Sequence, residues 1–398
     1  MSQAPLTPIH PQPGNLLDVR SFVGRRQTTD QALRLLRRGQ NLLLSDPRRM
    51  GKTFWLHYVA ESQNEFEPYL INYEGVDTAT GFIERTIAGV GRRPDLPRRV
   101  RTTVMTLVEN VDSINLGLVT IKPSMKEMPP QDLLTMVLGS LKDPGSGKVP
   151  LILMDEVPLA IKNIASRDGG DSARALLQTM RYLRQSLRGV QWIVTGSIGF
   201  HHVLHIAGAT SADVNDLDPL ILGSLERQEA EELAQRLLLG VRVGGNSQAR
   251  LEPAPEVAAE LVRLTDGIPF LMHQVMSLVD QAQVAHLDAA RMRVYWERTI
   301  DDPDQHQAFA HFLERLDVYY DRPFLELARG LLDACLSRDR EPRPVEDLCP
   351  DKASQDILDT LVNDHYLEYV QQGMACRWRY PALQYIWARR RRIWEAGA

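Results

Sequence analysis

Residues 41–59 read NLLLSDPRRMGKTFWLHYV, and this stretch limits the folds that the chain can adopt. A short apolar segment is followed by a tight loop, by Gly51-Lys52-Thr53 and by a helical segment. A strand that turns through glycine into a helix opens a strand–helix–strand unit. Such units build parallel sheets with helices on both faces, so the stretch predicts the α/β class.

Two later segments repeat the pattern. VPLILMDEVP at 149–158 and VQWIVTGS at 190–197 are continuous apolar runs, as expected for strands buried inside a parallel sheet, and a helical segment separates them. PYLINYEGV at 68–76 reads as a further strand. Residues 77–148 hold helical pieces, and the alternating run at 111–122 predicts a strand or hairpin.

Beyond residue 222 the pattern is helical. Two helices are broken at DGIPF, residues 266–270, and the last hundred residues end in helix, strand, turn at Gln372-Gly373 and strand, which is the order of a winged helix. The prolines of MSQAPLTPIHPQPGN predict an extended, mobile arm. We therefore expect an arm at 1–20, an αβ core at 21–222, a helical lid at 223–300 and a winged helix at 301–398.

Composition excludes several classes of protein. A length of 398 residues allows two or three domains, and a net charge of −5 excludes a polycation that coats nucleic acid. Three scattered cysteines fit no zinc pattern and favour a reducing compartment. No apolar run reaches the roughly 20 residues of a membrane span, and the N-terminus is not a signal peptide, so we expect a cytoplasmic protein without membrane contact.

The loop after the first strand has the composition of a phosphate cradle. Such a cradle needs backbone N–H groups at a helix N-terminus, a lysine for the outer phosphates and a hydroxyl for Mg²⁺. Lys52 and Thr53 supply the last two. Asp46 stands where glycine usually opens the loop, and aspartate is one of the few other residues that visit left-handed conformations. The predicted nucleotide-binding residues are Asp46, Pro47, Arg48, Arg49, Met50, Gly51, Lys52, Thr53 and Phe54.

Two carboxylates follow the strand LILM. Asp155 and Glu156 are expected at the carboxyl end of that strand, where open α/β sheets bind ligands. Asp155 is predicted to hold Mg²⁺ together with Thr53, and Glu156 to polarise the water that attacks the γ-phosphate. Ser197, and Thr195 before it, end the next strand, where a hydroxyl can touch phosphate or orient water. The alternatives are a solvated acidic turn and a plain Gly-Ser turn.

In these residues the chain resembles the AAA+ P-loop ATPases of the archaeal type, which are related to the STAND and Orc/Cdc6-like ATPases. The resemblance runs through FVGRRQ (22–27), DPRRMGKT, LILMDE, IVTGS and GIPF to the C-terminal ILDTLVNDHYLEY and RWRYPALQYIW. It implies a parallel-sheet core, Mg-ATP bound between core and lid, and a C-terminal winged helix. By position it implies that Lys52 binds phosphate, that Thr53 and Asp155 bind the metal, and that Glu156 and Ser197 are catalytic.

The same resemblance places Val23 or Arg25 beside the base and has Pro269 close the pocket. One departure concerns the rate: no arginine occurs between Ser197 and Arg227, so the usual arginine finger is missing. Because such a finger is worth about 10³–10⁵ in rate, we expect slow hydrolysis. The candidate substitutes for the finger are Arg181, Arg184 and Arg188, on the preceding helical segment.

Two basic stretches and one histidine group remain. Arg389, Arg390, Arg391 and Arg392 are either a solvated helix end or a DNA-backbone contact. The stretch Arg92 to Arg101 is a surface insertion or faces a neighbouring copy of the chain. His201, His202 and His205 have a spacing that could bind metal, but a turn-and-helix surface is the simpler interpretation.

Three functions follow from these residues. The favoured one is a slowly hydrolysing ATP/ADP switch that controls a protein effector on another chain through its domain arrangement. The first alternative is an ATP-dependent, initiator-like DNA-binding protein that acts through its winged helix. The second is a non-catalytic scaffold with a degenerate nucleotide site. A homo-oligomer is compatible with all three.

Overall fold

The computed structural model describes residues 6–14, 18–93, 95–109, 119–142, 147–197, 199–243, 246–252, 254–301, 316–317, 320 and 322–394. The chain divides into two compact units. The first, here the helical unit, comprises residues 1–25, 47–51 and 222–398; the second, here the sheet unit, comprises residues 26–46 and 52–221.

The sheet unit is built on five parallel strands in the order β2-β3-β4-β1-β5. The strands are β1 (Asn41–Ser45), β2 (Phe66–Asn72), β3 (Val149–Asp155), β4 (Gln191–Gly196) and β5 (Leu217–Leu220). In β3 every residue after Val149 is buried, and in β4 every residue is buried. Continuous burial explains why these two strands read as unbroken apolar runs. The predicted α/β class with a parallel sheet is confirmed.

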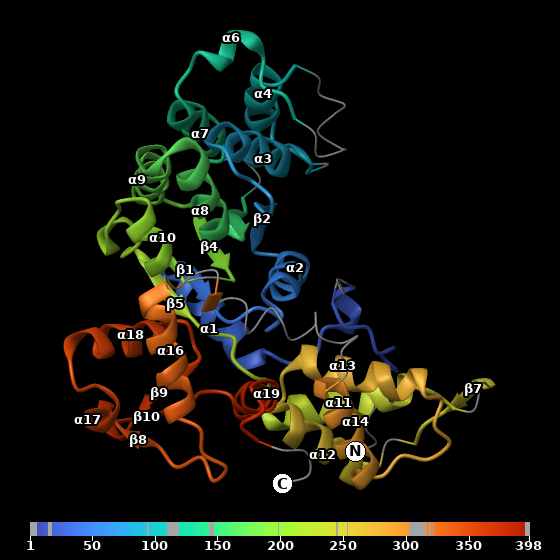
Figure 1. Cartoon of the computed structure of the whole chain (residues 1–398). Helices are drawn as coiled ribbons and strands as arrows, with labels where there is room; N and C mark the ends of the chain where they lie inside the picture. The colour runs from blue at the N-terminus through green and yellow to red at the C-terminus, as the bar shows by residue number, and fades with distance from the viewer. Residues whose placement is uncertain are drawn as a thin grey trace. The chain divides into compact units, whose positions relative to one another are not determined.

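Helices make up much of the rest of the sheet unit (Figure 1). They are α1 (Arg26–Arg37), α2 (Lys52–Ser62), α3 (Ala79–Gly91), α4 (Arg98–Leu107), α6 (Pro123–Lys126), α7 (Pro130–Gly139), α8 (Val157–Asp168), α9 (Gly170–Ser186), α10 (Phe200–Ile206) and the 3-10 turn η2 (Ser211–Asp213). Helices α1, α2, α3 and α8 contact the strands directly. Most of the predicted strand or hairpin at 111–122 lies outside the described residues, although Val108 and Ile121 form an antiparallel bridge beside it.

The first part of the helical unit corresponds to the predicted lid. It contains η1 (Val19–Ser21), α11 (Arg227–Gly240), the short hairpin β6 (Arg242–Val243) and β7 (Asn246–Arg250), α12 (Pro255–Thr265), α13 (Pro269–Gln281) and α14 (Ala289–Asp301). The break predicted at DGIPF is present: Asp266 and Gly267 have φ of 53° and 64°, and Pro269 is the first residue of α13. Two consecutive left-handed residues end α12, and proline starts the next helix because its fixed φ suits that position.

The C-terminal part contains α16 (Arg322–Ala334), β8 (Arg343–Pro344), α17 (Val345–Leu348), α18 (Lys352–Asn363), β9 (Leu367–Val370), η4 (Gln371–Gly373), β10 (Ala375–Trp378) and α19 (Pro381–Arg390). Strands β8, β10 and β9 form an antiparallel sheet in that order. The predicted succession of helix, strand, turn and strand is therefore observed. The winged-helix assignment and the predicted domain boundaries stay predictions.

The N-terminal arm has contacts within the helical unit. Residues 6–12 pack on the lid helices: the Ile9 N–H donates to the carbonyl of Arg236 (2.8 Å), and the Gln12 N–H donates to Nδ1 of His273 (3.1 Å). Burial lowers the pKa of His273 to about 4, which leaves its ring neutral and able to accept. A Cβ on Gly240 would stand 1.9 Å from the Ile9 carbonyl oxygen. These contacts and the buried Ile9 side chain hold residues 6–12 against the lid helices, which the sequence did not predict. The mobility of the arm stays a prediction.

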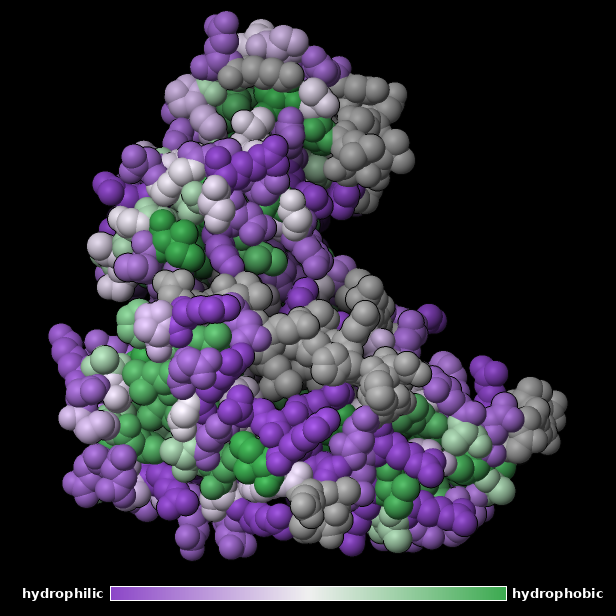
Figure 2. Space-filling view, viewed as in Figure 1, coloured by the Kyte–Doolittle hydropathy of each residue, from purple (hydrophilic) through white to green (hydrophobic). Residues whose placement is uncertain are grey.

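Hydrophilic side chains cover most of the face seen in Figure 2, with smaller hydrophobic areas between them. Among the described residues, no helix has the length and apolarity needed to cross a membrane. The three cysteines are free, and Cys335 and Cys376 are buried. They therefore fill space in the C-terminal part, as the sequence predicts.

Candidate functional site

Three neighbouring strand ends of the sheet unit carry the predicted polar residues. Strand β4 lies between β1 and β3, and all three run parallel, so their carboxyl ends meet at one edge of the sheet. Asp46 follows β1, Glu156 follows β3 and Ser197 follows β4. The topology therefore brings together residues that are more than 100 positions apart in the chain.

The Thr53 hydroxyl donates to Oδ2 of Asp155 across 2.6 Å, although 102 residues separate the two in sequence. The Asp155 side chain is only 1% exposed. Burial raises its pKa to about 6, while the Thr53 hydrogen bond acts in the opposite direction. A hydroxyl paired with a buried carboxylate is an all-oxygen donor set of the kind that Mg²⁺ prefers, so these two residues fit the ion.

Burial of Asp155 predicts a pH-dependent cost to stability. The pKa of the carboxyl rises from 3.8 in the unfolded chain to about 6 in the folded protein. The protonated Asp155 carboxyl therefore contributes favourably to the free energy of unfolding below pH 4. This contribution is lost as the pH rises through 6. We expect Asp155→Asn, without Mg²⁺, to be more stable than wild type by about 3 kcal/mol above pH 7, and by less at pH 5.

Urea unfolding of wild type and Asp155→Asn at pH 5 and pH 8, in the presence of a chelator, measures this difference. Because the two proteins share all their other titrating groups, the difference between their free energies of unfolding reports on Asp155 alone. A variant that is less stable than wild type at both pH values would contradict the prediction.

Lys52 is the first residue of α2 and is only 6% exposed. Its ammonium donates to the carbonyl oxygen of Asp46 across 2.7 Å. The lysine thus lies back across the loop that precedes it, with its charge at the loop's opening residue. A buried ammonium needs such an acceptor, and an anionic phosphate oxygen is a stronger one than a neutral carbonyl.

The loop backbone turns at two residues. Arg49 and Gly51 have positive φ, 71° and 89°, whereas Asp46 does not. The sequence pattern predicts the unusual conformation at Asp46, a residue type that tolerates it. The loop instead makes its left-handed turn at Arg49 and Gly51, so the aspartate at the opening position is not strained.

Glu156 and Ser197 are held together at the same edge. Oε2 of Glu156 accepts hydrogen bonds from the Ser197 hydroxyl (2.8 Å) and from the Ser197 backbone N–H (3.1 Å). Glu156 has φ 58°, a left-handed conformation that is uncommon for a side chain of this size. Thr195, fully buried at the end of β4, has a hydroxyl with no hydrogen-bond partner among the described residues.

Most of the other predicted nucleotide-binding residues belong to the helical unit, whereas Phe54, in α2, belongs to the sheet unit. Val23, Met50 and Ile268 are members of its hydrophobic core. The Arg49 guanidinium lies over the Phe270 ring, 4.9 Å from its centroid, one residue beyond Pro269. Arg25 is 5% exposed and is hydrogen bonded to backbone carbonyl oxygens of its own unit. Sequence reasoning missed this set of contacts because the partners lie far away in the chain: 199 positions separate Arg25 from Ser224, and Arg49 and Phe270 are still further apart.

Three of the arginines for which the sequence suggested a role as arginine finger or DNA contact form ion pairs with aspartates of their own unit. Arg184 is wrong as a substitute arginine finger: its side chain is 2% exposed and forms two hydrogen bonds with Asp216, at 2.7 and 2.8 Å. Near the C-terminus Arg389 pairs with Asp301, and Arg391 pairs with Asp333. Two of the four consecutive arginines are therefore engaged inside the helical unit. In the stretch 92–101, the side chains of Arg98, Arg99 and Arg101 are exposed. Nε of Arg93 lies 3.4 Å from Oε1 of Glu67.

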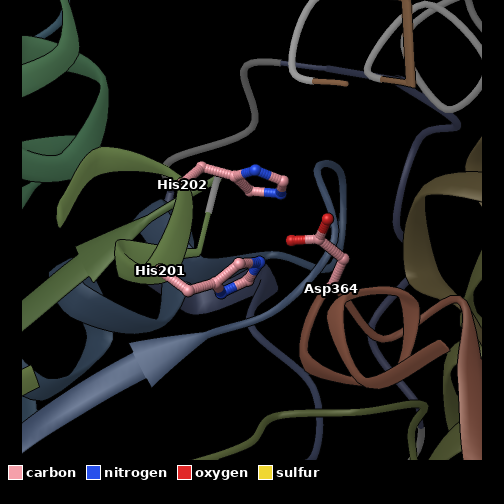
Figure 3. A group of neighbouring side chains, drawn as sticks. All are labelled: His201, His202 and Asp364. Atoms are coloured by element: carbon pink, nitrogen blue, oxygen red, sulfur yellow. The ribbon is translucent and has the colours of Figure 1, made fainter. Parts of the chain in front are cut away.

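The histidine group lies on α10. Figure 3 shows the rings of His201 and His202, whose centroids are 4.2 Å apart. His205, on the same short helix, is exposed. Asp364, also labelled in the figure, belongs to the helical unit, where it accepts a hydrogen bond from the Tyr320 hydroxyl (2.8 Å).

Comparison with protein-family models finds no match, and comparison with curated proteins finds none either. Solved structures do match. The Walker-type ATPase PABY2304 of Pyrococcus abyssi is similar over 96% of this chain and 99% of its own, with a TM-score of 0.57 and 16% identity. The ORC2 protein of Aeropyrum pernix, solved as ADPNP–ADP complexes, matches 96% of this chain and 95% of its own, with a TM-score of 0.48 and 12% identity.

The fold assignment rests on the first of these, together with the parallel sheet and the strand-end residues above. The similarity extends over nearly the whole of both chains, so it concerns the complete architecture and not the sheet alone. The resemblance inferred from the motifs is confirmed at the level of the fold. The chain has the fold of an AAA+ P-loop ATPase.

Proposed function

We propose that this protein is an ATP-binding, slowly hydrolysing switch that controls a partner protein through nucleotide-dependent domain arrangement. One observation carries the proposal: Thr53, directly after Gly51-Lys52, is hydrogen bonded to Asp155, directly before Glu156. A chance Gly-Lys-Thr would have no reason to meet a buried strand-end carboxylate. Together the two motifs supply a phosphate-binding lysine, a pair of metal ligands and a base.

The loop and Lys52 would bind the phosphates. Backbone N–H groups of residues 48–53 precede and begin α2, an 11-residue helix whose N-terminus favours anions. Lys52 would exchange its carbonyl acceptor, Asp46, for a phosphate oxygen. Thr53 and Asp155 would hold Mg²⁺, which neutralises charge on the phosphates when it is bound.

Glu156 would act as the base. Ser197 holds one carboxylate oxygen with two hydrogen bonds and so fixes the direction of the other, which can accept a proton from the attacking water. Ser197 is thus a positioning residue for Glu156. Slow turnover follows because no arginine occurs between Ser197 and Arg227 and because Arg184 is engaged with Asp216.

The C-terminal surface favours a protein partner over DNA. In a helix-turn-helix the second helix enters the major groove, and here that helix is α18, after α17 and a three-residue turn. Exposed acidic residues cover this pair of helices: Glu346, Asp347, Asp351, Asp356 and Asp359. Lys352 is the one basic residue between 345 and 364. Such a surface would repel phosphate, and the engaged Arg389 and Arg391 do not offset it.

The degenerate-site alternative rested on Asp46. Its backbone does not need the glycine conformation, and its carbonyl takes part in the Lys52 contact. These observations favour a working loop.

Turnover and shape of the purified full chain test the proposal together. We expect Mg²⁺-dependent hydrolysis below about 0.1 s⁻¹, since the lack of an arginine finger lowers the rate by about 10³–10⁵. We also expect small-angle scattering curves to differ between the ADP-bound state and the state bound to a non-hydrolysable ATP analogue. Identical curves in the two states would contradict the switch. Salt-sensitive DNA binding that is lost on changing Arg389 to Arg392 to alanine would favour the initiator-like alternative.

A further inference from the structure

Arg25 is a buried cation whose guanidinium donates to four backbone carbonyl oxygens. Its side chain and backbone belong to the helical unit and the residue is 5% exposed. Its own N–H donates to Oε2 of Glu229, on α11, across 2.8 Å. Its guanidinium donates to the carbonyl oxygens of Leu222 (2.5 Å), Gly223 (2.5 Å), Ser224 (3.0 Å) and Met50 (3.1 Å).

The backbone around Arg25 is shaped for this arrangement. Arg25 has φ 63°, in the left-handed region that side chains rarely adopt. A Cβ on the preceding Gly24 would come within 2.7 Å of the Glu229 carboxylate, so glycine is required there. Gly223, one of the four acceptors, also has a positive φ of 63°. Strain of this kind persists only where surrounding contacts fix it, and it gathers at functional positions.

The four carbonyls come from two functional segments. Residues 222–224 lie in the segment 221–226 that links β5, which ends at Leu220, to α11, which begins at Arg227. Met50 lies in the loop that leads into Lys52. The linker is tied to the lid as well, because the Leu225 N–H donates to the carbonyl of Gly267 (3.1 Å), in the DGIPF break. One guanidinium therefore joins the phosphate loop to the linker through which the lid is connected.

We propose that Arg25 is the positioning residue that couples the phosphate loop to the 222–224 linker. The proposal rests on the proposed function, since it requires ATP at the loop. A guanidinium has five donors in a rigid plane, and when it is buried each donor needs an acceptor. If phosphate binding shifts residues 47–51, the carbonyl of Met50 moves with them. The Arg25 guanidinium, which is hydrogen bonded to this carbonyl, then transmits the shift to the carbonyls of residues 222–224. Nucleotide state thereby sets the linker conformation.

This role differs from the one that the family resemblance implies. A residue beside the adenine would contribute to the choice of base. The guanidinium of Arg25 is instead aimed at four protein carbonyls of its own unit. The two roles predict different phenotypes for the same substitution, so one variant separates them.

The test uses Arg25→Lys, which keeps the charge but not the planar fork, with Arg26→Ala as control because Arg26 is the exposed neighbour. Hydrogen exchange is measured at residues 222–226 with and without a non-hydrolysable ATP analogue and Mg²⁺. In wild type and in Arg26→Ala we expect the analogue to slow this exchange about tenfold. In Arg25→Lys we expect the analogue to bind, with an unchanged preference for ATP over GTP, and the slowing at 222–226 to disappear.

A second variant keeps the test informative if Arg25→Lys does not fold. Glu229→Ala removes the anchor of the Arg25 backbone but leaves the guanidinium, so the slowing at 222–226 should shrink without vanishing. Full slowing in both variants would overturn the coupling while leaving ATP binding intact. Loss of base preference in Arg25→Lys, with slowing retained, would overturn it in favour of a base contact. A wild type that binds no nucleotide would overturn the proposed function and this inference with it.

Discussion

Replacing Glu156 with glutamine is expected to stop ATP turnover while ATP still binds. Glutamine has nearly the same shape and can still accept the Ser197 hydrogen bonds, but it cannot take a proton from water. Loss of a general base typically lowers the rate about 10²–10⁴-fold. We therefore expect the turnover of Glu156→Gln to fall by at least 10²-fold, measured as phosphate release, with the dissociation constant for Mg-ATP changed by less than about threefold.

Glu61→Gln is the matched control, because it makes the same chemical change at an exposed residue near the end of α2. It should hydrolyse ATP at the wild-type rate. Ser197→Ala should fall between the two, since Glu156 keeps its carboxylate but loses one of the hydrogen bonds that direct it. Wild-type turnover by Glu156→Gln would remove Glu156 from the chemistry.

Replacing Lys52 with alanine is expected to weaken ATP binding by about 10²-fold or more. The ammonium is buried, is positioned at the loop by Asp46, and would meet the phosphates directly. Removing one partner of a buried charge pair costs about 2–5 kcal/mol. Equilibrium titration with a fluorescent ATP analogue measures the loss.

Lys148→Ala supplies the control for that titration. Lys148 also follows a glycine but is exposed and lies before β3, outside the proposed site. Its replacement should leave the affinity unchanged. Equal losses in Lys52→Ala and Lys148→Ala would indicate non-specific attraction between ATP and surface cations.

Sequence reasoning found the strands that lie inside the sheet, β1, β3 and β4, because each reads as an apolar run. Burial is continuous in β4 and after Val149 in β3, and it alternates along β1. Strand β5 was missed because it is a four-residue edge strand, LDPL, in which aspartate and proline conceal the pattern. Helix α8 was missed because the acidic pair was read as leading into a turn, whereas the helix begins at Val157, directly after Glu156.

The site was predictable where its parts are local motifs. Lys52 and Thr53 follow from one stretch of sequence, and Asp155 and Glu156 from another. The contacts between them depend on strand order, which the sequence pattern does not specify. The hydrogen-bond partners of Arg25 and Arg184 depend on the fold even more. Backbone carbonyls and a distant aspartate form no sequence motif that would identify them as partners. The reading of Asp46 as a strained position was a local inference that the backbone of Arg49 and Gly51 corrects.

Calorimetric titration of the wild-type chain with ATP, with and without Mg²⁺, tests the central claim most directly, namely that residues 46–53 form a working nucleotide site. We predict one site per chain and binding that is tighter with Mg²⁺, because Thr53 and Asp155 provide its ligands. The Mg²⁺ effect should vanish in Asp155→Asn while binding of ATP itself persists. Absence of ATP binding by the folded wild-type protein under both conditions would contradict the account.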